Sequence, residues 1–291
     1  MTAQDPFVAH RGLLFTVAYE ILGSAADAED VLQESWLRWA GADRAEVRDP
    51  RSYLVRTVTR QSLNRLRTLA RRREEYVGEW LPEPLLTSPD VAEDVELAES
   101  VSMAVLTVLE TLGPTERAVF VLREVFDLPY GEIAEAVGRP AATVRQIARR
   151  ARAHVAARRP RVTVSRSEQQ AVVERFLLAL RTGRLQELLD VMAPDVVMIT
   201  DGGGVVAAGL TPFHGAELVA GLLARASEIT SDFAPVWLNG APAIRIDLDG
   251  EPSTVSATVA DGRITGLYVV RNPHKLTRLD EPAQLTLSCP R

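Results

Sequence analysis

The segment that decides the fold runs Tyr130-Gly-Glu-Ile-Ala-Glu-Ala-Val-Gly-Arg-Pro-Ala-Ala-Thr-Val-Arg-Gln-Ile-Ala-Arg-Arg-Ala-Arg-Ala-His-Val155. Apolar residues recur at helical spacing on both sides of the turn at 138–140, which predicts two helices packed across it: Ile133, Ala134, Val137, Val144, Ile147 and Ala151. Eight arginines and no acidic residue lie between 139 and 161. A DNA-recognition helix combines an apolar side with a cationic side in this way. A basic surface helix without a partner is the alternative, but the turn favours DNA binding.

Composition indicates several domains and several partners. The chain has 291 residues, of which 46% are apolar and 25% are charged, enough for two or three ordinary domains. The net charge of −6 hides a strong separation of charge along the sequence. Arginines gather in 48–73 and 139–161, whereas acids gather in 27–34 and 90–99. Segments of opposite charge predict partners of opposite charge.

The cysteine, the histidines and the N-terminus bear on chemistry and location. Cys289 is the only cysteine, so an internal disulfide and a thiol metal cluster are excluded. The histidines show no metal-ligand spacing, and we therefore expect neither a metal nor a cofactor. The first residues lack the features of a signal peptide, and no apolar run is long enough to span a membrane. These features predict a cytoplasmic protein with no membrane partner.

The pattern divides the chain into helical blocks and an α+β block. Helices are predicted over 7–22, 28–40 and 51–73, and a second helical block over 91–158. From Ser167 onward, helices over 167–181, 184–193 and 214–227 precede short strands, with hairpin turns at Asn239-Gly240 and Asp261-Gly262. This block predicts an α+β domain with a curved antiparallel sheet. The expected domains are 1–75, a linker over 76–95, 96–161, 166–276 and a flexible tail over 277–291.

Two N-terminal helices carry opposite charges. The run Asp27-Ala-Glu-Asp-Val-Leu-Gln-Glu-Ser-Trp36 puts Asp27, Asp30 and Glu34 along one helix face. A merely solvated acidic face is the alternative at this point. The helix from Arg51 repeats arginine at 56, 60, 67 and 71, with Tyr53 near its start. A basic face with an aromatic ring suits DNA whose bases are unstacked, because stacking and phosphate neutralisation then add.

These motifs carry a family resemblance. The segment Phe15–Ser24 and the acidic run resemble the second conserved region of bacterial sigma factors, and Tyr130–Val155 resembles their fourth region. The intermediate domain is missing, as in the extracytoplasmic-function (ECF) group. Three short motifs resemble signatures of the ECF subgroup with a fused SnoaL-like domain: Trp80-Leu-Pro-Glu-Pro84, Asp201-Gly-Gly-Gly204 and Asn272-Pro-His-Lys-Leu276.

The resemblance implies a fold and a set of contacts. The fold class is multidomain: a region 2 helical bundle and a region 4 helix-turn-helix, both all-α, followed by an α+β SnoaL-like cone. Core RNA polymerase would bind Asp27, Glu29, Asp30, Gln33 and Glu34. The minus-ten element of promoter DNA would contact Arg56, Arg60, Asn64, Arg65 and Arg67. The minus-thirty-five element would contact Thr143, Arg145, Gln146, Arg149 and Arg150. Interdomain contacts are expected at Trp80, Leu81, Pro82, Asp201, Gly202, Gly203, Asn272, Pro273 and Lys275.

Two positions depart from the family pattern. Many ECF factors have Asn and Asp where this chain has Arg60 and Asn64, so the base preference in the minus-ten element does not carry over. Many have a serine helix cap where this chain has Pro140, which changes the start of the recognition helix.

The fused domain is expected to regulate the sigma domains without a separate anti-sigma factor. An unknown small ligand in its cone is one possibility. Candidate polar groups for chemistry are Asp201, His214, Arg245 and Asp247, and acid–base catalysis would need two titratable groups facing one cavity. Arg245 and Asp247 share a strand face opposite Ile244, Ile246 and Leu248, which predicts an apolar interior instead. We therefore expect no enzymatic activity.

Three functions remain open from sequence. The first is an alternative sigma factor that directs transcription initiation at specific promoters. The second is a stand-alone helix-turn-helix regulator, which would not need the acidic face at 27–36. The third is a DNA-binding module fused to a small-molecule enzyme or sensor.

Overall fold

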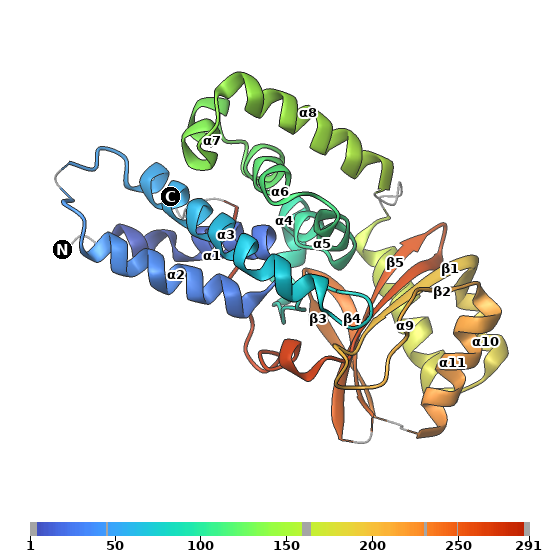
Figure 1. The fold of residues 1–291 in the computed structure, drawn as a ribbon. Coiled ribbons are helices and arrows are strands. Elements are labelled where there is room, and N and C mark those ends of the chain that lie inside the picture. Colours follow the sequence, from blue (N-terminus) through green and yellow to red (C-terminus); the bar gives the residue numbers. More distant parts are fainter. Residues whose placement is uncertain (1–4, 45, 159–163, 230–231, 249, 288–291) are drawn as a thin grey trace.

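The N-terminal domain is a bundle of three helices, α1 (Pro6–Leu22), α2 (Ala25–Ala40) and α3 (Pro50–Glu74) (Figure 1). The structure is a computed structural model that describes residues 5–44, 46–158, 164–229, 232–248 and 250–287. Proline at the first position and the Asp5 carboxylate, which accepts from Phe7 N at 2.9 Å, start α1. Gly23 ends α1 with φ of 69°, and Ser24 caps α2.

The second helical domain contains the predicted helix-turn-helix. It comprises η1 (Pro89–Glu93), α4 (Val95–Ser100), α5 (Met103–Glu110), α6 (Pro114–Phe120), the π-helical turn η2 (Val121–Val125), α7 (Tyr130–Val137) and α8 (Ala141–Arg158). Gly138 ends α7 with φ of 66°, which permits the tight turn into α8. The predicted apolar positions of α7 and α8 are buried or partly buried in one cluster, so this prediction is confirmed.

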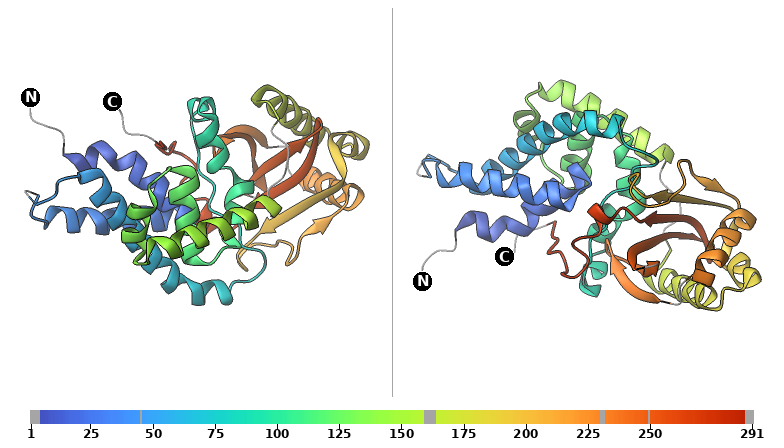
Figure 2. Two further views of the ribbon diagram at one scale, coloured as in Figure 1. Left: turned by 90° about the horizontal axis from the view of Figure 1, so that it is seen from above. Right: turned by 60° about the horizontal axis from the view of Figure 1, so that its bottom comes forward.

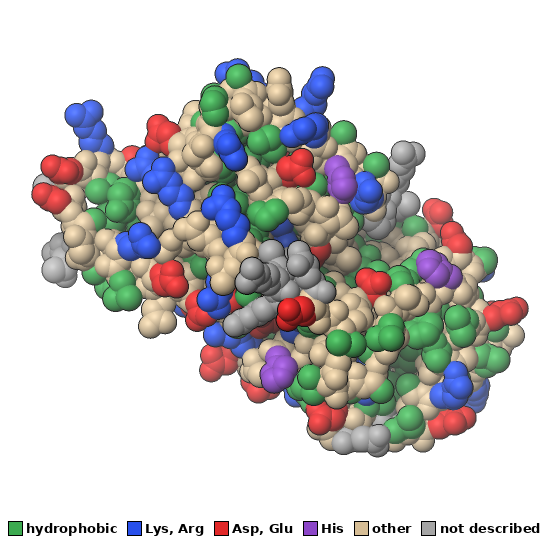
Figure 3. All heavy atoms as spheres, in the orientation of Figure 1, with side chains coloured by type: hydrophobic (Ala, Val, Ile, Leu, Met, Phe, Trp, Pro, Cys, Tyr) green, Lys and Arg blue, Asp and Glu red, His purple; other side chains and the backbone are tan. Residues whose placement is uncertain are grey.

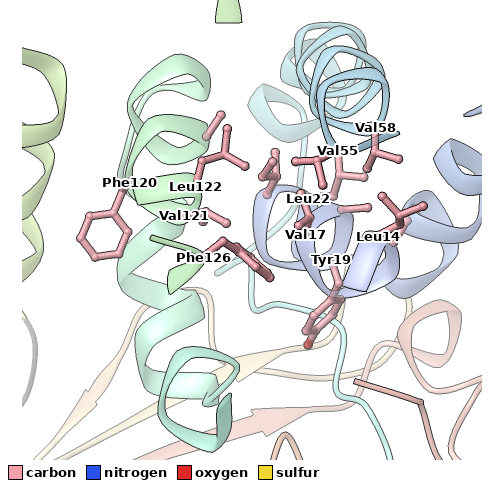
Figure 4. Packing of buried hydrophobic residues seen from close by; sticks show 14 of the residues in the cluster. Leu14, Val17, Tyr19, Leu22, Val55, Val58, Phe120, Val121, Leu122 and Phe126 are labelled. Atoms are coloured by element: carbon pink, nitrogen blue, oxygen red, sulfur yellow. The ribbon is translucent and has the colours of Figure 1, made fainter. Parts of the chain in front are cut away.

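The two helical domains share one hydrophobic core. Side chains of α1 and α3, such as Val17 and Val55, belong to the same buried cluster as Val121 and Phe126 of the second domain. Figure 4 shows these groups facing one another from the two sides of a single apolar layer. Burial of apolar area is the main source of folding free energy. The two domains therefore form a closed arrangement in this structure.

The C-terminal domain is α+β. Helices α9 (Arg166–Thr182) and α10 (Leu185–Val191) lead into β1 (Met192–Asp201) and β2 (Phe213–His214). Then follow α11 (Ala216–Ile229), β3 (Phe233–Leu238), β4 (Ala241–Leu248), β5 (Glu251–Ala260), β6 (Arg263–Val270) and the short turn η3 (Pro273–Lys275). The sheet order is β2-β1-β6-β5-β4-β3. The prediction of an antiparallel sheet holds for four of the five strand pairs among the described residues, whereas β1 and β6 pair in parallel after the long crossover through α11 and β3–β5.

The sheet has two differently covered faces. The helices α9, α10 and α11 pack on one face over a cluster that includes Phe176, Ile244 and Ile246. The other face carries Ala243 and Val270, which pack against Leu81 of the linker and Leu276 after η3. Figure 2 shows the helical layer on the outside of the domain and the opposite side turned toward the helical domains. The predicted inward direction of Ile244 and Ile246 is confirmed by their burial.

The linker and the C-terminal segment lie against the domains. Leu86 forms a β-bridge with Leu238, and Thr87 N donates to Trp237 O at 3.0 Å. The tail was expected to be flexible from 277 onward, and the structure differs. Leu279 is buried, and Thr286 N donates to Thr16 Oγ1 of α1 at 3.1 Å. The apolar residues that lie between the prolines of this segment pack against the rest of the protein, whereas the prolines alone had suggested disorder. Residues 288–291 of the predicted tail lie outside the described residues.

Candidate nucleic-acid and polymerase interfaces

The outer face of α8 presents all five residues predicted to read the minus-thirty-five element. Thr143, Arg145, Gln146, Arg149 and Arg150 are exposed, while Val144 and Ile147 on the opposite side are buried. Figure 3 shows basic side chains along the top of the molecule, over the region of α8 in Figure 1. An exposed helix with cationic and amide side chains can enter a major groove and donate to guanine and phosphate oxygens.

The first half of α3 contacts α7 through partly exposed side chains. Arg56 Nη1 lies 2.6 Å from Glu135 Oε2, and Arg60 Nη2 donates to the Glu135 backbone oxygen at 2.7 Å. Ser52 Oγ donates to Glu132 Oε2 at 3.0 Å. Two of the residues predicted to contact the minus-ten element are therefore occupied by the first helix of the helix-turn-helix.

The remaining predicted minus-ten residues take two directions. Asn64 and Arg67 are exposed and bonded to each other, with Arg67 Nη1 donating to Asn64 Oδ1 at 3.1 Å. Arg65 turns toward α2 instead and contacts Asp27 at 2.6 Å and Asp30 at 2.9 Å. Partial burial acts to lower the pKa of the Arg65 guanidinium, but the hydrogen bond and charge of Asp27 together with the charge of Asp30 outweigh it and raise that pKa. Arg65 thus ties α3 to α2 in this structure.

The acidic face predicted to bind polymerase lies along α2. Asp30, Gln33 and Glu34 are exposed, whereas Asp27 and Glu29 are half-buried. Glu29 pairs with Arg11 of α1 at 2.7 Å, and Glu34 accepts from Gln61 at 3.0 Å. Exposed carboxylates of this kind steer association with a basic partner more than they add affinity.

A buried ion pair joins the linker to the C-terminal domain. The Asp201 carboxylate, fully buried at the end of β1, accepts from Tyr76 OH at 2.5 Å and from Leu81 N at 2.9 Å. Lys275 Nζ donates to Asp201 Oδ2 at 2.7 Å and to Leu81 O at 2.6 Å, and lies 3.3 Å from the Trp80 ring centroid. Burial raises the pKa of the Tyr76 hydroxyl, and the neighbouring Asp201 adds to the rise.

The other residues of the three motifs surround this ion pair. Pro82, Gly202 and Asn272 are buried, and Pro273 is half-buried. Gly203 adopts φ of 61°, and a Cβ there would collide with the Asn272 side chain, so only glycine fits. The structure thus brings together residues from all three predicted motifs.

Asn239 forms a second junction that the sequence did not reveal. Its side chain is 1% exposed and bonds three parts of the chain: Nδ2 donates to Tyr19 OH at 2.7 Å and to Val101 O at 2.9 Å, and Oδ1 accepts from Leu85 N at 3.0 Å. Sequence reading recognised the hairpin turn, with φ of 53° at Asn239, but no local pattern indicates where its tip docks. The turn therefore links both helical domains and the linker.

A buried charged cluster was also missed. Glu20 of α1 accepts from Ser100 Oγ at 2.9 Å, and its backbone oxygen accepts from Arg117 Nε at 2.9 Å. Arg117 is 1% exposed and pairs with Glu110 at 2.6 Å. Burial raises the pKa of Glu20 to about 8, against the opposing effects of Ser100 and Arg117. This cluster lies where α1 meets the second helical domain.

The candidate polar groups for catalysis do not converge. Asp201 is committed to Lys275, and His214 is exposed on β2. Arg245 pairs loosely with Asp280 at 3.4 Å, and Asp247 accepts from Gly250 N at 2.7 Å. Within the described residues, these four side chains form no shared site with a pair of facing titratable groups. In the same ranges, no helix is long and apolar enough to cross a membrane.

The comparisons with known proteins define the class. The family model of sigma-70 region 2 matches residues 7–72, and that of sigma-70 region 4 matches residues 102–155. These are the bundle α1–α3 and the segment that ends in α7 and α8, so the two helical domains are those of a sigma factor of RNA polymerase.

The full-length matches narrow this class. The chain is 34% identical over 288 residues to the ECF RNA polymerase sigma factor SigJ of Mycobacterium tuberculosis, with 93% of this chain and 92% of that protein covered. It is 32% identical to the probable ECF sigma factor SigI of the same species, with 96% and 98% covered. The crystal structure of SigJ superposes with a TM-score of 0.77 at 32% identity, covering 97% of this chain and 99% of that chain. The chain belongs to the ECF RNA polymerase sigma factors, carries a C-terminal α+β domain within the part that matches SigJ, and acts as an alternative sigma factor in transcription initiation.

Proposed function

We propose that this sigma factor binds core RNA polymerase through the acidic face of α2 and promoter DNA through α3 and α8, and that the fused domain controls the distance between these helices. The observation that carries the proposal is the contact of Arg56 and Arg60 with Glu135. The side-chain carboxylate and the backbone carbonyl oxygen of Glu135 bind the guanidinium groups of Arg56 and Arg60, which would otherwise be available to neutralise DNA phosphates.

The two DNA surfaces differ in their state. The α8 face is exposed and ready for a major groove, with Arg145, Gln146 and Arg149 as base-reading candidates. Arg56 and Arg60 on the first half of α3 would exchange their contacts with Glu135 for DNA phosphates when α7 moves away. Binding of the minus-ten element would therefore follow separation of the helix-turn-helix from α3, and each phosphate contact would add to a salt-dependent affinity.

The fused domain supports the closed arrangement through Asn239. This side chain bonds Tyr19 in the first helical domain and Val101 in the second, so the hairpin bridges the two. The Asp201–Lys275 pair anchors the linker between them. Regulation by a covalently attached domain would need no separate anti-sigma factor, and we expect the protein to act in the cytoplasm beside its polymerase.

The fused domain is proposed to act without catalysis. The apolar cluster around Phe176 and Ile244 fills the helix-covered side of the sheet, and the candidate acids and bases lie apart. A small ligand inside the cone stays a prediction.

Run-off transcription with purified core polymerase tests the proposal. The template is the DNA upstream of the protein's own gene, and the full-length chain is compared with Glu135→Gln. Loss of the carboxylate charge weakens the contact with Arg56, so we expect more transcript and tighter promoter binding. Glu96→Gln is the matched control, because Glu96 is an exposed acid on α4 that takes no part in the contact of Glu135 with Arg56 and Arg60. Equal activity of both variants, or less transcript from Glu135→Gln alone, would refute the role of the closed contact.

A further inference from the structure

A buried carboxyl group lies in the contact between α1 and the second helical domain. Glu20 of α1 is 0% exposed, and its Oε1 accepts from Ser100 Oγ, at the end of α4, at 2.9 Å. The backbone oxygen of Glu20 accepts from Arg117 Nε of α6 at 2.9 Å, and Arg117 Nη1 donates to Glu110 Oε1 of α5 at 2.6 Å. Residues of α1, α4, α5 and α6 thus form one polar cluster inside a contact that is otherwise apolar.

The hydrogen bonds of the cluster do not satisfy an ionised Glu20. Its second oxygen, Oε2, is buried and has no hydrogen-bond partner among the described residues. Arg117 Nη2 is buried as well, and it bonds neither oxygen of this carboxyl group. A buried carboxylate that accepts a single hydrogen bond is strongly disfavoured, whereas the neutral acid is far less so. Burial accordingly raises the pKa of Glu20 to about 8, against the opposing effects of Ser100 and Arg117.

The cation beside Glu20 is already paired. Within the described residues, Arg117 is the charged group that acts on the pKa of Glu20, and the buried side chains of α2, α3, α4 and η2 carry no charge. Glu110 neutralises Arg117 at a distance of 2.6 Å. Ionised Glu20 would therefore leave two carboxylates beside a single guanidinium group in a buried cluster.

The neighbouring titratable groups supply no further positive charge to the cluster. Burial raises the pKa of the Tyr19 hydroxyl, which therefore stays neutral. Glu83 of the linker faces the first amides of α2, and burial raises its pKa against these bonds and the charge of Arg278. The neutral acid is thus the form of Glu20 that fits the closed arrangement of the two helical domains.

Separation of the second helical domain from α1 would expose Glu20 to water, where the pKa of a glutamate is 4.5. Between this value and about 8, the closed arrangement keeps a proton that the open arrangement releases to the solvent. Rising pH therefore favours the open arrangement, by a factor of up to about ten for each pH unit. The effect levels off above the pKa of the closed arrangement, where Glu20 is ionised in both.

We propose that the proton on Glu20 is a switch between the two helical domains: the neutral acid holds α1 against α4 and α6, and loss of the proton releases them. The steepest response falls at mildly acidic to neutral pH. Its consequence for promoter DNA rests on the function proposed above, because Arg56 and Arg60 leave Glu135 when the domains separate.

Hydrogen exchange of the full-length protein, read by mass spectrometry from about pH 5.5 to about pH 9, tests the switch. Rates are expressed as protection factors, which removes the chemical effect of pH on exchange. The helices α4 and α6 are too short to persist without packing, so their amides report the separation. We expect their protection to fall by up to about tenfold for each pH unit up to about pH 8 and to level off above it.

The dependence on urea separates this opening from global unfolding. Separation of the domains exposes less surface than unfolding does, so protection of α4 and α6 should respond to low urea less steeply than global unfolding of the same protein. Protection that does not change with pH would overturn the proposal. A urea dependence as steep as that of global unfolding would overturn it too.

Variants assign the proton to Glu20. Glu20→Gln keeps an oxygen for Ser100 but cannot ionise, so its protection should no longer change with pH. Glu96→Gln makes the same change at an exposed position of α4 and should keep the wild-type response. Ser100→Ala removes a bond that favours the ionised form, so the fall in protection should extend to higher pH than in the wild type. The wild-type response in Glu20→Gln, or in Ser100→Ala where Glu20→Gln does not fold, would contradict the switch. The readout needs neither polymerase nor promoter, so it stands or fails separately from the transcription experiment.

Discussion

Replacing Asn239 by alanine should loosen the junction between the fused domain and the two helical domains. The substitution removes three buried hydrogen bonds, to Tyr19, Val101 and Leu85. At about 1 kcal/mol net for each bond, the loss is about 3 kcal/mol. Alanine at φ of 53° adds about 1 kcal/mol of backbone strain, because it lacks the short polar side chain with which asparagine tolerates the left-handed region.

Asp261 provides a matched control for the strain. It occupies the same position in the β5–β6 turn with φ of 50°, it is exposed, and it takes no part in the hydrogen bonds of the junction. Asp261→Ala should therefore carry the strain alone. The difference in free energy between the two variants therefore measures the hydrogen bonds of the junction alone. About 3 kcal/mol corresponds to a factor on the order of 100 in the equilibrium constant for opening of the junction.

Hydrogen exchange of the linker amides measures that equilibrium directly. The Leu85 amide donates to Asn239 Oδ1, so its exchange should accelerate by that factor in Asn239→Ala. The same amide should be nearly unaffected in Asp261→Ala. Urea unfolding of both variants gives an independent measure of the lost stability. If the two variants exchange and unfold alike, the side chain of Asn239 does not hold the junction, and the reasoning is refuted.

Three further perturbations follow from the buried charges. Lys275→Met leaves the Asp201 carboxylate buried without its cation and should destabilise the protein by about 3–5 kcal/mol in urea unfolding, with part recovered in the double variant with Asp201→Asn. Arg117→Gln should lower the free energy of unfolding by a similar amount, because Arg117 is 1% exposed. Arg65→Gln should lower it by under about 1 kcal/mol, because the Arg65 side chain is 32% exposed. Equal losses of stability in the two variants would contradict this reasoning. Because the pKa of Glu20 rises from 4.5 to about 8 on folding, the folded state keeps a proton that the unfolded chain releases, so wild-type stability falls as pH rises between these values. Glu20→Gln should remove that component, and an unchanged pH slope would show that Glu20 does not titrate in this range.

The helix-turn-helix was predictable because its information is local. Apolar spacing fixes which sides of α7 and α8 are buried, and Gly138 supplies the left-handed turn between them. Once Val144 and Ile147 face inward, Arg145, Gln146 and Arg149 must face outward, as the structure shows. The hairpin turns were equally readable, since both carry positive φ where Asn-Gly or Asp-Gly stands.

The remaining features depend on contacts between distant segments. Arg65 follows the same basic pattern as Arg56, yet it turns to Asp27 because α2 packs on that side of α3. Glu20 is buried although it is acidic, because α1 is enclosed by α2, α3 and the second helical domain. The parallel pairing of β1 with β6 joins strands far apart in sequence. No spacing within one segment encodes such partners.

The contacts that close the structure are of two kinds, and their position indicates an order of opening. Asn239 bonds the backbone at Val101, directly after α4, where polar groups are buried and hydrogen-bonded, and the shared apolar core contains residues of α7 and α8 as well as of the segment through η2. The contact of α7 with α3 includes ion pairs at partly exposed residues, with Glu135 65% exposed, and such pairs are weak and screened by salt. Between these parts lie the π-helical turn η2 and Asp127, whose φ of 46° is strained for a non-glycine residue. We therefore expect α7 and α8 to move from α3 first, about the segment 121–127, while the fused domain keeps its hold on α4. That order would free Arg56 and Arg60 for DNA, and α7 side chains in the shared core, such as Ile133, would have to repack.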